Sequence, residues 1–326
     1  MELVNKKNFI EKEELIKKAI IRVIAFFDLL DYALTVQEIY DLIWLENFTD
    51  RLDFVDVNNL LLEMTGKYLD VKDNFYFFIG REELVKKRIE SVSLIEKKYK
   101  VGLKAIGYLK FVPGVKMVAV CNSLAMGNVN QESDIDLFII TSVNRIWATR
   151  LLVTLIVQFL GVRRRRQSIS DRVCLSFYIS EKQMNLQAIT LSPDPYFNYW
   201  LATLNPVYGK HAFINFCQEN FWLKNYLPNS LKTASDFKRI VNDNKFSTIF
   251  KNINGLWFES IVGNQLERFV KYLQLKKMSK NVNSLAKEND SRVIISDLML
   301  KFHETDRRQE LKDRWENKVK QINEKI

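Results

Sequence analysis

Histidine, cysteine and proline are scarce in this chain of 326 residues, which contains two, three and five of them respectively. The cysteines Cys121, Cys174 and Cys217 lack the paired spacing of a zinc site or a disulfide framework, which favours a reducing cytoplasm. The histidines form no recognisable Ser-His-Asp or metal-ligand pattern, so the sequence gives no support to a hydrolase or a zinc enzyme. The few prolines leave little room for long irregular linkers.

Long hydrophobic runs are also missing. The first seven residues lack the apolar region of a secretory signal. The most membrane-like stretch, 151–162, is shorter than the ~20 residues that span a bilayer. We therefore expect no membrane partner, and we interpret this stretch as a buried helix that crosses over between strands of a sheet.

Apolar residues and positive charge, by contrast, are plentiful. With 47% hydrophobic residues the chain can bury large cores, and its length suggests two or three domains. The net charge is +10, but residues 1–90 contain 13 Lys and Arg against 18 Asp and Glu, so residues 91–326 carry +15. The basic part suits a polyanionic ligand, such as a nucleoside triphosphate, RNA or DNA.

Two carboxylates stand out in the segment 117–141, which reads MVAVCNSLAMGNVNQESDIDLFIIT. Asp134 and Asp136 are two residues apart in an apolar strand pattern, so their side chains should emerge on the same side. Burying two like charges is costly unless a cation compensates them. Carboxylate oxygens suit Mg²⁺, and we therefore predict that Asp134 and Asp136 hold this metal.

A tight turn of small residues precedes these carboxylates. Residues 117–121 form a short apolar run typical of a buried strand, and Asn122, Ser123 and the residues up to Gly127 then open a helix. Such a turn aims backbone N–H groups at an anion, and the Ser123 hydroxyl adds a donor for the terminal phosphates of a nucleotide. This layout suits phosphoryl or nucleotidyl transfer.

These residues resemble the nucleotidyltransferase superfamily that includes DNA polymerase beta and kanamycin nucleotidyltransferase. The longer arrangement looks like bacterial nucleotidyltransferase-domain proteins of unassigned substrate. The matching positions, within about 25 residues, are Ser123, Ala125, Gly127, Ser133, Asp134, Asp136 and Leu137. Asn122 stands where the family normally has Gly, and Met126 where it frequently has Arg.

The resemblance implies Mg²⁺-dependent transfer of a nucleoside monophosphate from a nucleoside triphosphate to an acceptor, which is a small molecule, a protein or RNA. Asp134 and Asp136 would be the catalytic metal ligands. Four further residues are implied in nucleotide binding: Asn122, Ser123, Gly127 and Ser133.

A third carboxylate, which the family supplies from a neighbouring strand, is not evident. The strand pattern 173–179 has Cys174 or Ser176 in its place. Asp171 and Glu181 flank this strand, roughly 10 Å or more from its middle at ~3.3 Å per residue. Two alternatives therefore stay open: an active nucleotidyltransferase, and a degenerate nucleotide-binding or regulatory protein.

The rest of the chain predicts an α+β protein. Three helices and a hairpin near the N-terminus resemble a winged-helix domain, with a capping box at Thr35 and Glu38. Its third helix has no Lys or Arg between Asp56 and Glu63, which argues against DNA binding and favours a protein contact. The predicted parts are a winged-helix-like domain at 1–80, a connecting helix at 81–109, a nucleotidyltransferase-like mixed-sheet core at 110–192 and a helical C-terminal domain at 193–326.

Three groups of cations lie outside the motif. We expect the run 97–100 to face solvent along the connecting helix. The four arginines 163–166 fit a helix end better than a nucleic-acid contact. Arg307 and Arg308, close to His303, are candidates for stabilising pyrophosphate charge, because guanidinium matches phosphate.

Overall fold

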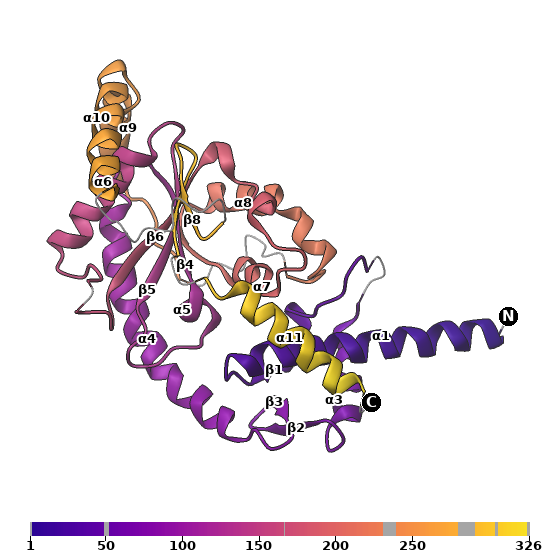
Figure 1. Cartoon of the computed structure of the whole chain (residues 1–326). Helices are drawn as coiled ribbons and strands as arrows, with labels where there is room; N and C mark the ends of the chain where they lie inside the picture. The colour runs from indigo at the N-terminus through magenta and orange to yellow at the C-terminus, as the bar shows by residue number, and fades with distance from the viewer. Residues whose placement is uncertain are drawn as a thin grey trace.

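The computed structural model describes residues 2–48, 52–165, 167–230, 239–279, 291–303 and 306–324. Side chains are described from residue 11 onward. Within these ranges the chain is a mixed α+β protein with one small and one large β-sheet (Figure 1). None of the helices there is long and apolar enough to cross a membrane.

The N-terminal part combines three helices with the small sheet. The capping box is confirmed, since the Thr35 side chain accepts from the Glu38 backbone N–H and the Glu38 side chain accepts from that of Thr35. The small sheet is antiparallel, in the order β1-β3-β2. The predicted three helices and hairpin are thus present, and the winged-helix assignment stays a prediction. The elements are α1 (Glu2–Leu29), β1 (Leu34–Thr35), α2 (Val36–Asp41), α3 (Phe54–Met64), β2 (Leu69–Lys72) and β3 (Phe75–Phe78).

The large sheet has six strands in the order β7-β4-β5-β6-β9-β8. Among the described strands of this sheet, β5 and β6 are the only parallel neighbours, and α6 (Ile146–Phe159) connects them, as predicted for the apolar stretch before the arginine run. The strands are β4 (Val115–Cys121), β5 (Ile135–Thr141), β6 (Val173–Ser180), β7 (Asn205–Tyr208), β8 (Val293–Ile295) and β9 (Met299–Phe302).

Helices cover both faces of this sheet, because successive side chains of each strand point to opposite sides. On one face, Val120 and Leu137 pack with residues of α4 (Glu83–Leu109) and α6. On the other face, Phe138 and Phe177 pack with residues of α7 (Pro195–Thr203) and α8 (Lys210–Glu219). Asp136 lies between Ile135 and Leu137 and therefore points to the second face.

The segment after residue 192 is not purely helical, in contrast to the prediction. It supplies β7, β8 and β9 to the large sheet, together with helices. These strands have only three or four residues, so their alternation of apolar and polar residues is too short to be recognised in the sequence. Pro206 within β7 also argues against a strand, and it is tolerated because β7 is at the edge of the sheet. The domain limits stay a prediction. The remaining helices are α5 (Asn122–Met126), η1 (Glu181–Gln183), η2 (Gln187–Ile189), η3 (Phe221–Asn225), α9 (Lys245–Phe258), α10 (Ile261–Met278) and α11 (Arg308–Asn323).

The helix α11 packs against the second half of α1, although the two helices are far apart in the sequence (Figure 1). The Trp315 indole N–H donates to the carbonyl oxygen of Arg22 at 2.8 Å, and the rings of Trp315 and Trp44 are 5.2 Å apart. These helices lie on the same side of the large sheet as Asp136, and they help to enclose the site described next.

Candidate functional site

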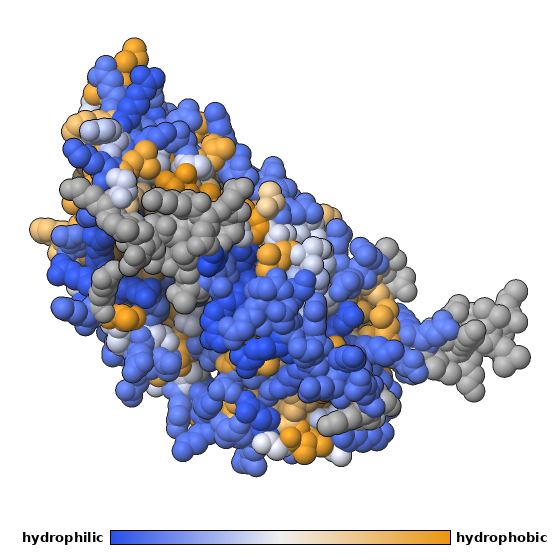
Figure 2. All heavy atoms as spheres, viewed as in Figure 1, coloured by the Kyte–Doolittle hydropathy of each residue, from blue (hydrophilic) through white to orange (hydrophobic). Residues whose placement is uncertain are grey.

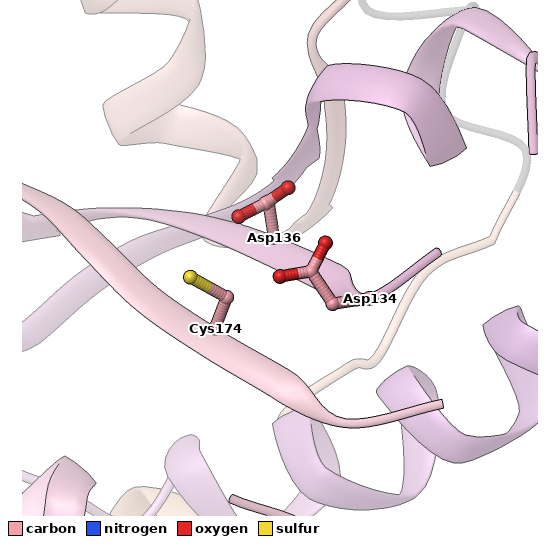
Figure 3. Close-up of side chains that lie close together, drawn as sticks. All are labelled: Asp134, Asp136 and Cys174. Atoms are coloured by element: carbon pink, nitrogen blue, oxygen red, sulfur yellow. The ribbon is translucent and has the colours of Figure 1, made fainter. Parts of the chain in front are cut away.

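Two carboxylates and a thiol converge at the end of the parallel strand pair. Asp136 lies on β5, with Cys174 of β6 as its register partner, and Asp134 lies just before β5. One ligand atom from each of the three side chains lies within 4.8 Å of the others. Figure 3 shows the two carboxylates side by side, with the Cys174 sulfur directed toward Asp136. The two-residue spacing therefore brings the carboxylates together as predicted.

The third position of the cluster belongs to Cys174. Asp171 is held elsewhere, by ion pairs of 2.7 Å to both Lys97 and Lys98. In the part of the chain that the structure describes, neither Asp171 nor Glu181 joins the cluster. Burial, and then the charge of Asp136, raise the pKa of the Cys174 thiol to about 12, so it is protonated at neutral pH. A hard cation would thus find two oxygen donors and one poorly matched sulfur.

Arg164 contacts the cluster, which the sequence analysis missed. One of its terminal nitrogens is 2.8 Å from the Asp134 carboxylate and 3.4 Å from the Cys174 sulfur. The Arg164 backbone N–H donates to the Val173 carbonyl, so residues 163 and 164 lie alongside the start of β6 instead of merely ending a helix. Arg166 lies outside the described residues. The guanidinium compensates part of the negative charge of the two aspartates.

The predicted nucleotide-binding residues separate into two groups. Asn122 and Ser123 begin α5 directly after β4, and Asn122 has a positive φ of 55°. Glycine adopts this conformation most readily and asparagine tolerates it, which is consistent with asparagine at a position where the resemblance expects glycine. The Asn122 side chain also acts on Asp136, where it favours the charged form of the carboxyl group.

Ser133 and Gly127 instead hold the local structure together. The Ser133 hydroxyl accepts from the Asn130 backbone N–H and donates to the Asn130 side chain, both at 3.0 Å. Gly127 ends α5 with a φ of 78° and lies against Tyr32 of the N-terminal part, whose hydroxyl would be 3.0 Å from an added Cβ. These contacts give both residues a structural role in the fold.

A cavity of about 300 Å³ adjoins the cluster at Asn122. Phe177 of β6 and its register partner Lys301 of β9 line it, from the same face of the sheet as Asp136. The remaining walls come from the end of α1, from α7 and α11, and from residues between β9 and α11. The other aromatic and cationic lining residues are Tyr196, Phe197, Trp200, His303, Arg307, Arg308 and Arg314.

The charged groups around this cavity are tied into local pairs. Arg308, predicted as a pyrophosphate contact, is buried and binds Asp194 at 3.0 Å and Asp306 at 2.8 Å. Arg307 is exposed and pairs with Glu310. Burial, and then repulsion by Arg308, lower the pKa of Lys301 to about 8. Burial, and then the charge of Lys301, lower the pKa of His303 to about 4, so this imidazole is neutral at pH 7.

Lys98 corrects the expectation that the run 97–100 faces solvent. Its side chain is fully buried, and its ammonium group donates to the Ser133 carbonyl at 2.6 Å and to Asp171 at 2.7 Å. It also donates to the Gln131 carbonyl at 3.3 Å, so it fixes the loop that leads into Asp134. The sequence did contain a sign that Lys98 is buried, because position 98 falls on the apolar stripe of α4 with Ile95 and Gly102.

Asp136 makes the stability of the metal-free protein pH-dependent. Burial, and then the charge of Asp134, raise the pKa of Asp136 to about 6. Since this lies above the ~3.9 of an unfolded aspartate, the folded state binds the proton more tightly. We therefore expect the contribution of Asp136 to the free energy of unfolding to fall by about 2 to 3 kcal/mol as the pH rises from about 4 to above 6.

Urea unfolding across this pH range, in chelator-treated buffer, measures the effect. Asp136→Asn serves as the control, because it removes the titrating group and should flatten this part of the profile. Equal slopes for the wild type and the variant would show that another group causes the dependence.

No protein-family model matches this sequence, and no match was found among curated proteins or solved structures.

Proposed function

We propose that this chain is a nucleotidyltransferase, which moves a nucleoside monophosphate from a nucleoside triphosphate to an acceptor hydroxyl or phosphate group and releases pyrophosphate. The observation that supports it is the convergence of Asp134 and Asp136 beside a cavity with aromatic and cationic walls. The raised pKa of Asp136 supports a cation here, because it reflects a buried carboxylate whose charge is only partly compensated.

In this proposal Asp134 and Asp136 hold Mg²⁺ through carboxylate oxygens. Mg²⁺ held there would neutralise phosphate charge, which is the main requirement of phosphoryl and nucleotidyl transfer. Asn122 and Ser123 would contact the phosphates from the start of α5. Arg164, whose guanidinium is 2.8 Å from Asp134, would supply a further positive charge for them. The aromatic walls of the cavity suit a nucleotide base.

A second candidate is a nucleotide-binding protein that does not turn its ligand over. The observation that favours it is Cys174, which takes the place where a third carboxylate would complete the site. Nucleotide binding would then act as a signal, and the N-terminal part would contact a partner protein. DNA is not favoured as that partner, because α3 offers no cation between Asp56 and Glu63.

Pyrophosphate release from each of the four labelled triphosphates with Mg²⁺, together with a search for labelled product, tests these candidates. We expect Cys174→Asp to lower the Mg²⁺ concentration for half-maximal nucleotide binding at least tenfold, since it adds an oxygen ligand. Cys174→Ser is the matched control, since serine keeps the size without the charge.

Turnover by the wild type, increased in Cys174→Asp, supports the enzyme. Metal-dependent nucleotide binding without pyrophosphate release in both proteins supports the second candidate. If neither protein binds a nucleotide in the presence of Mg²⁺, both candidates are wrong.

A further inference from the structure

The helices α9 and α10 form a hairpin that projects from the body of the protein (Figure 1). The turn that connects the two helices, and the middle of α10, are fixed by buried polar contacts. The Arg145 side chain donates to the Phe258 carbonyl at 2.6 Å, and Glu267 accepts from the backbone N–H groups of Trp147 and Ala148 at 2.9 and 2.8 Å. The hairpin is therefore anchored to the start of α6 and held in one orientation.

An apolar stripe runs along the exposed side of α9. The side chains recur at the three- and four-residue spacing of a helix face, and each is 40 to 80% exposed. No charged residue interrupts the stripe, because the two lysines of α9, at its start and at position 251, lie at other angles around the helix. The stripe consists of Phe246, Ile249, Phe250, Ile253, Leu256 and Trp257.

The neighbouring helix α10 also exposes large apolar side chains to solvent. Its Val270 and Glu267 are buried against the body, whereas five large apolar side chains are 46 to 77% exposed. Figure 2 shows hydrophobic side chains at the tip of the hairpin, between hydrophilic ones. The five are Ile261, Val262, Phe269, Tyr272 and Leu273.

The amount of exposed apolar surface is that of a stable interface. At roughly 100 Å² for each half-exposed large side chain, the six on α9 expose about 600 Å², and the eleven on the two helices together about 1,100 Å². The largest apolar patch of a typical monomer is about 300 to 600 Å², and each partner in a standard interface buries about 800 Å². The α9 stripe alone lies at the top of the first range, and the two helices together reach the second value.

The charges around the stripe favour a protein surface over an anionic lipid surface. Lys251 pairs with Asp243 and Lys271 pairs with Asp297, so two of the six cations on α9 and α10 are neutralised within the chain. A hairpin that binds anionic lipids would keep such cations free. Paired cations also reduce the repulsion between two identical hairpins.

We propose that the α9–α10 hairpin is a dimerisation surface, which packs against the same hairpin of a second copy of this chain. Two helical hairpins with apolar stripes form a four-helix arrangement, and a two-fold axis makes each stripe complementary to itself. The interface is formed without residues of the carboxylate cluster, so it is independent of the proposed function.

Sedimentation equilibrium and light scattering of the full chain test this proposal. We expect twice the 38.5 kDa mass of one chain at micromolar concentration. The double variant Ile253→Glu/Leu256→Glu should raise the dimer dissociation constant at least 100-fold. Because both side chains are largely exposed, the fold should survive, and circular dichroism checks this. Leu62→Glu, an exposed leucine on α3, is the matched control and should remain dimeric.

A monomeric wild type at all concentrations would overturn the proposal, as would a dimer that the hairpin variant leaves intact. A monomer that sediments with anionic phospholipid vesicles in a hairpin-dependent manner would instead identify a lipid surface as the partner, and it would equally overturn the proposal.

Discussion

Replacing Asp134 and Asp136 together by asparagine is expected to abolish Mg²⁺-dependent nucleotide binding and turnover, while the metal-free variant melts at least as high as the wild type. The loss of binding follows because the only two carboxylates of the cluster supply its charged oxygen ligands. The melting temperature should not fall, because Asp136 is 7% exposed and its charge is destabilised by burial and by Asp134. Arg164 loses its partner at little cost, since it is partly exposed.

Thermal unfolding with and without Mg²⁺ and a nucleoside triphosphate measures both effects on one sample. The wild type should gain stability from the ligands by mass action, and the double variant should not. Glu132→Gln is the matched control, because this exposed acid precedes the cluster in the same loop. A double variant that keeps the ligand-induced shift would disprove the metal assignment.

Substituting Lys98 by methionine is expected to lower the free energy of unfolding by about 3 kcal/mol. It removes a fully buried ammonium group and the three hydrogen bonds that this group donates. The carbonyl groups of Gln131 and Ser133 lose this donor. Asp171 retains Lys97 as a partner, which limits the loss. Because the freed loop leads into Asp134, we also expect the affinity for Mg²⁺ to fall about tenfold.

Lys97→Met provides the control for this prediction. Lys97 pairs with the same carboxylate at the same 2.7 Å, but its side chain is 65% exposed, so its removal should cost less than about 1 kcal/mol. Urea unfolding gives the two free energies, and calorimetric titration with Mg²⁺ gives the affinities. Equal losses in the two variants would mean that the burial of Lys98 contributes nothing.

The cluster also explains how a cysteine can occupy the third position without unfolding the protein. A third carboxylate at residue 174 would add a buried charge beside Asp136, whose own pKa is already raised. The neutral thiol avoids this cost when no metal is bound. Cysteine at position 174 also leaves the site one oxygen ligand short, and the Cys174→Asp variant would supply that ligand.

Local sequence patterns determined several features correctly. Strand alternation placed Asp134 and Asp136 on one side, and the apolar run before the arginines identified the crossover helix α6. The capping box at Thr35 marked the start of α2. These features follow from periods of two or 3.6 residues and from short-range hydrogen bonds, so they can be seen without knowing which strands become neighbours.

Only the tertiary structure decided which distant residues meet at the site. The choice between Cys174 and Ser176 depended on the pairing register of β5 and β6, which shifts just after Asp136. Lys98 reaches Asp171 across 73 residues, and Arg164 reaches Asp134 because residues 163 and 164 pair with the start of β6. Strand register and long-range pairing are set by the packing of whole elements, and no single stretch of sequence contains that information.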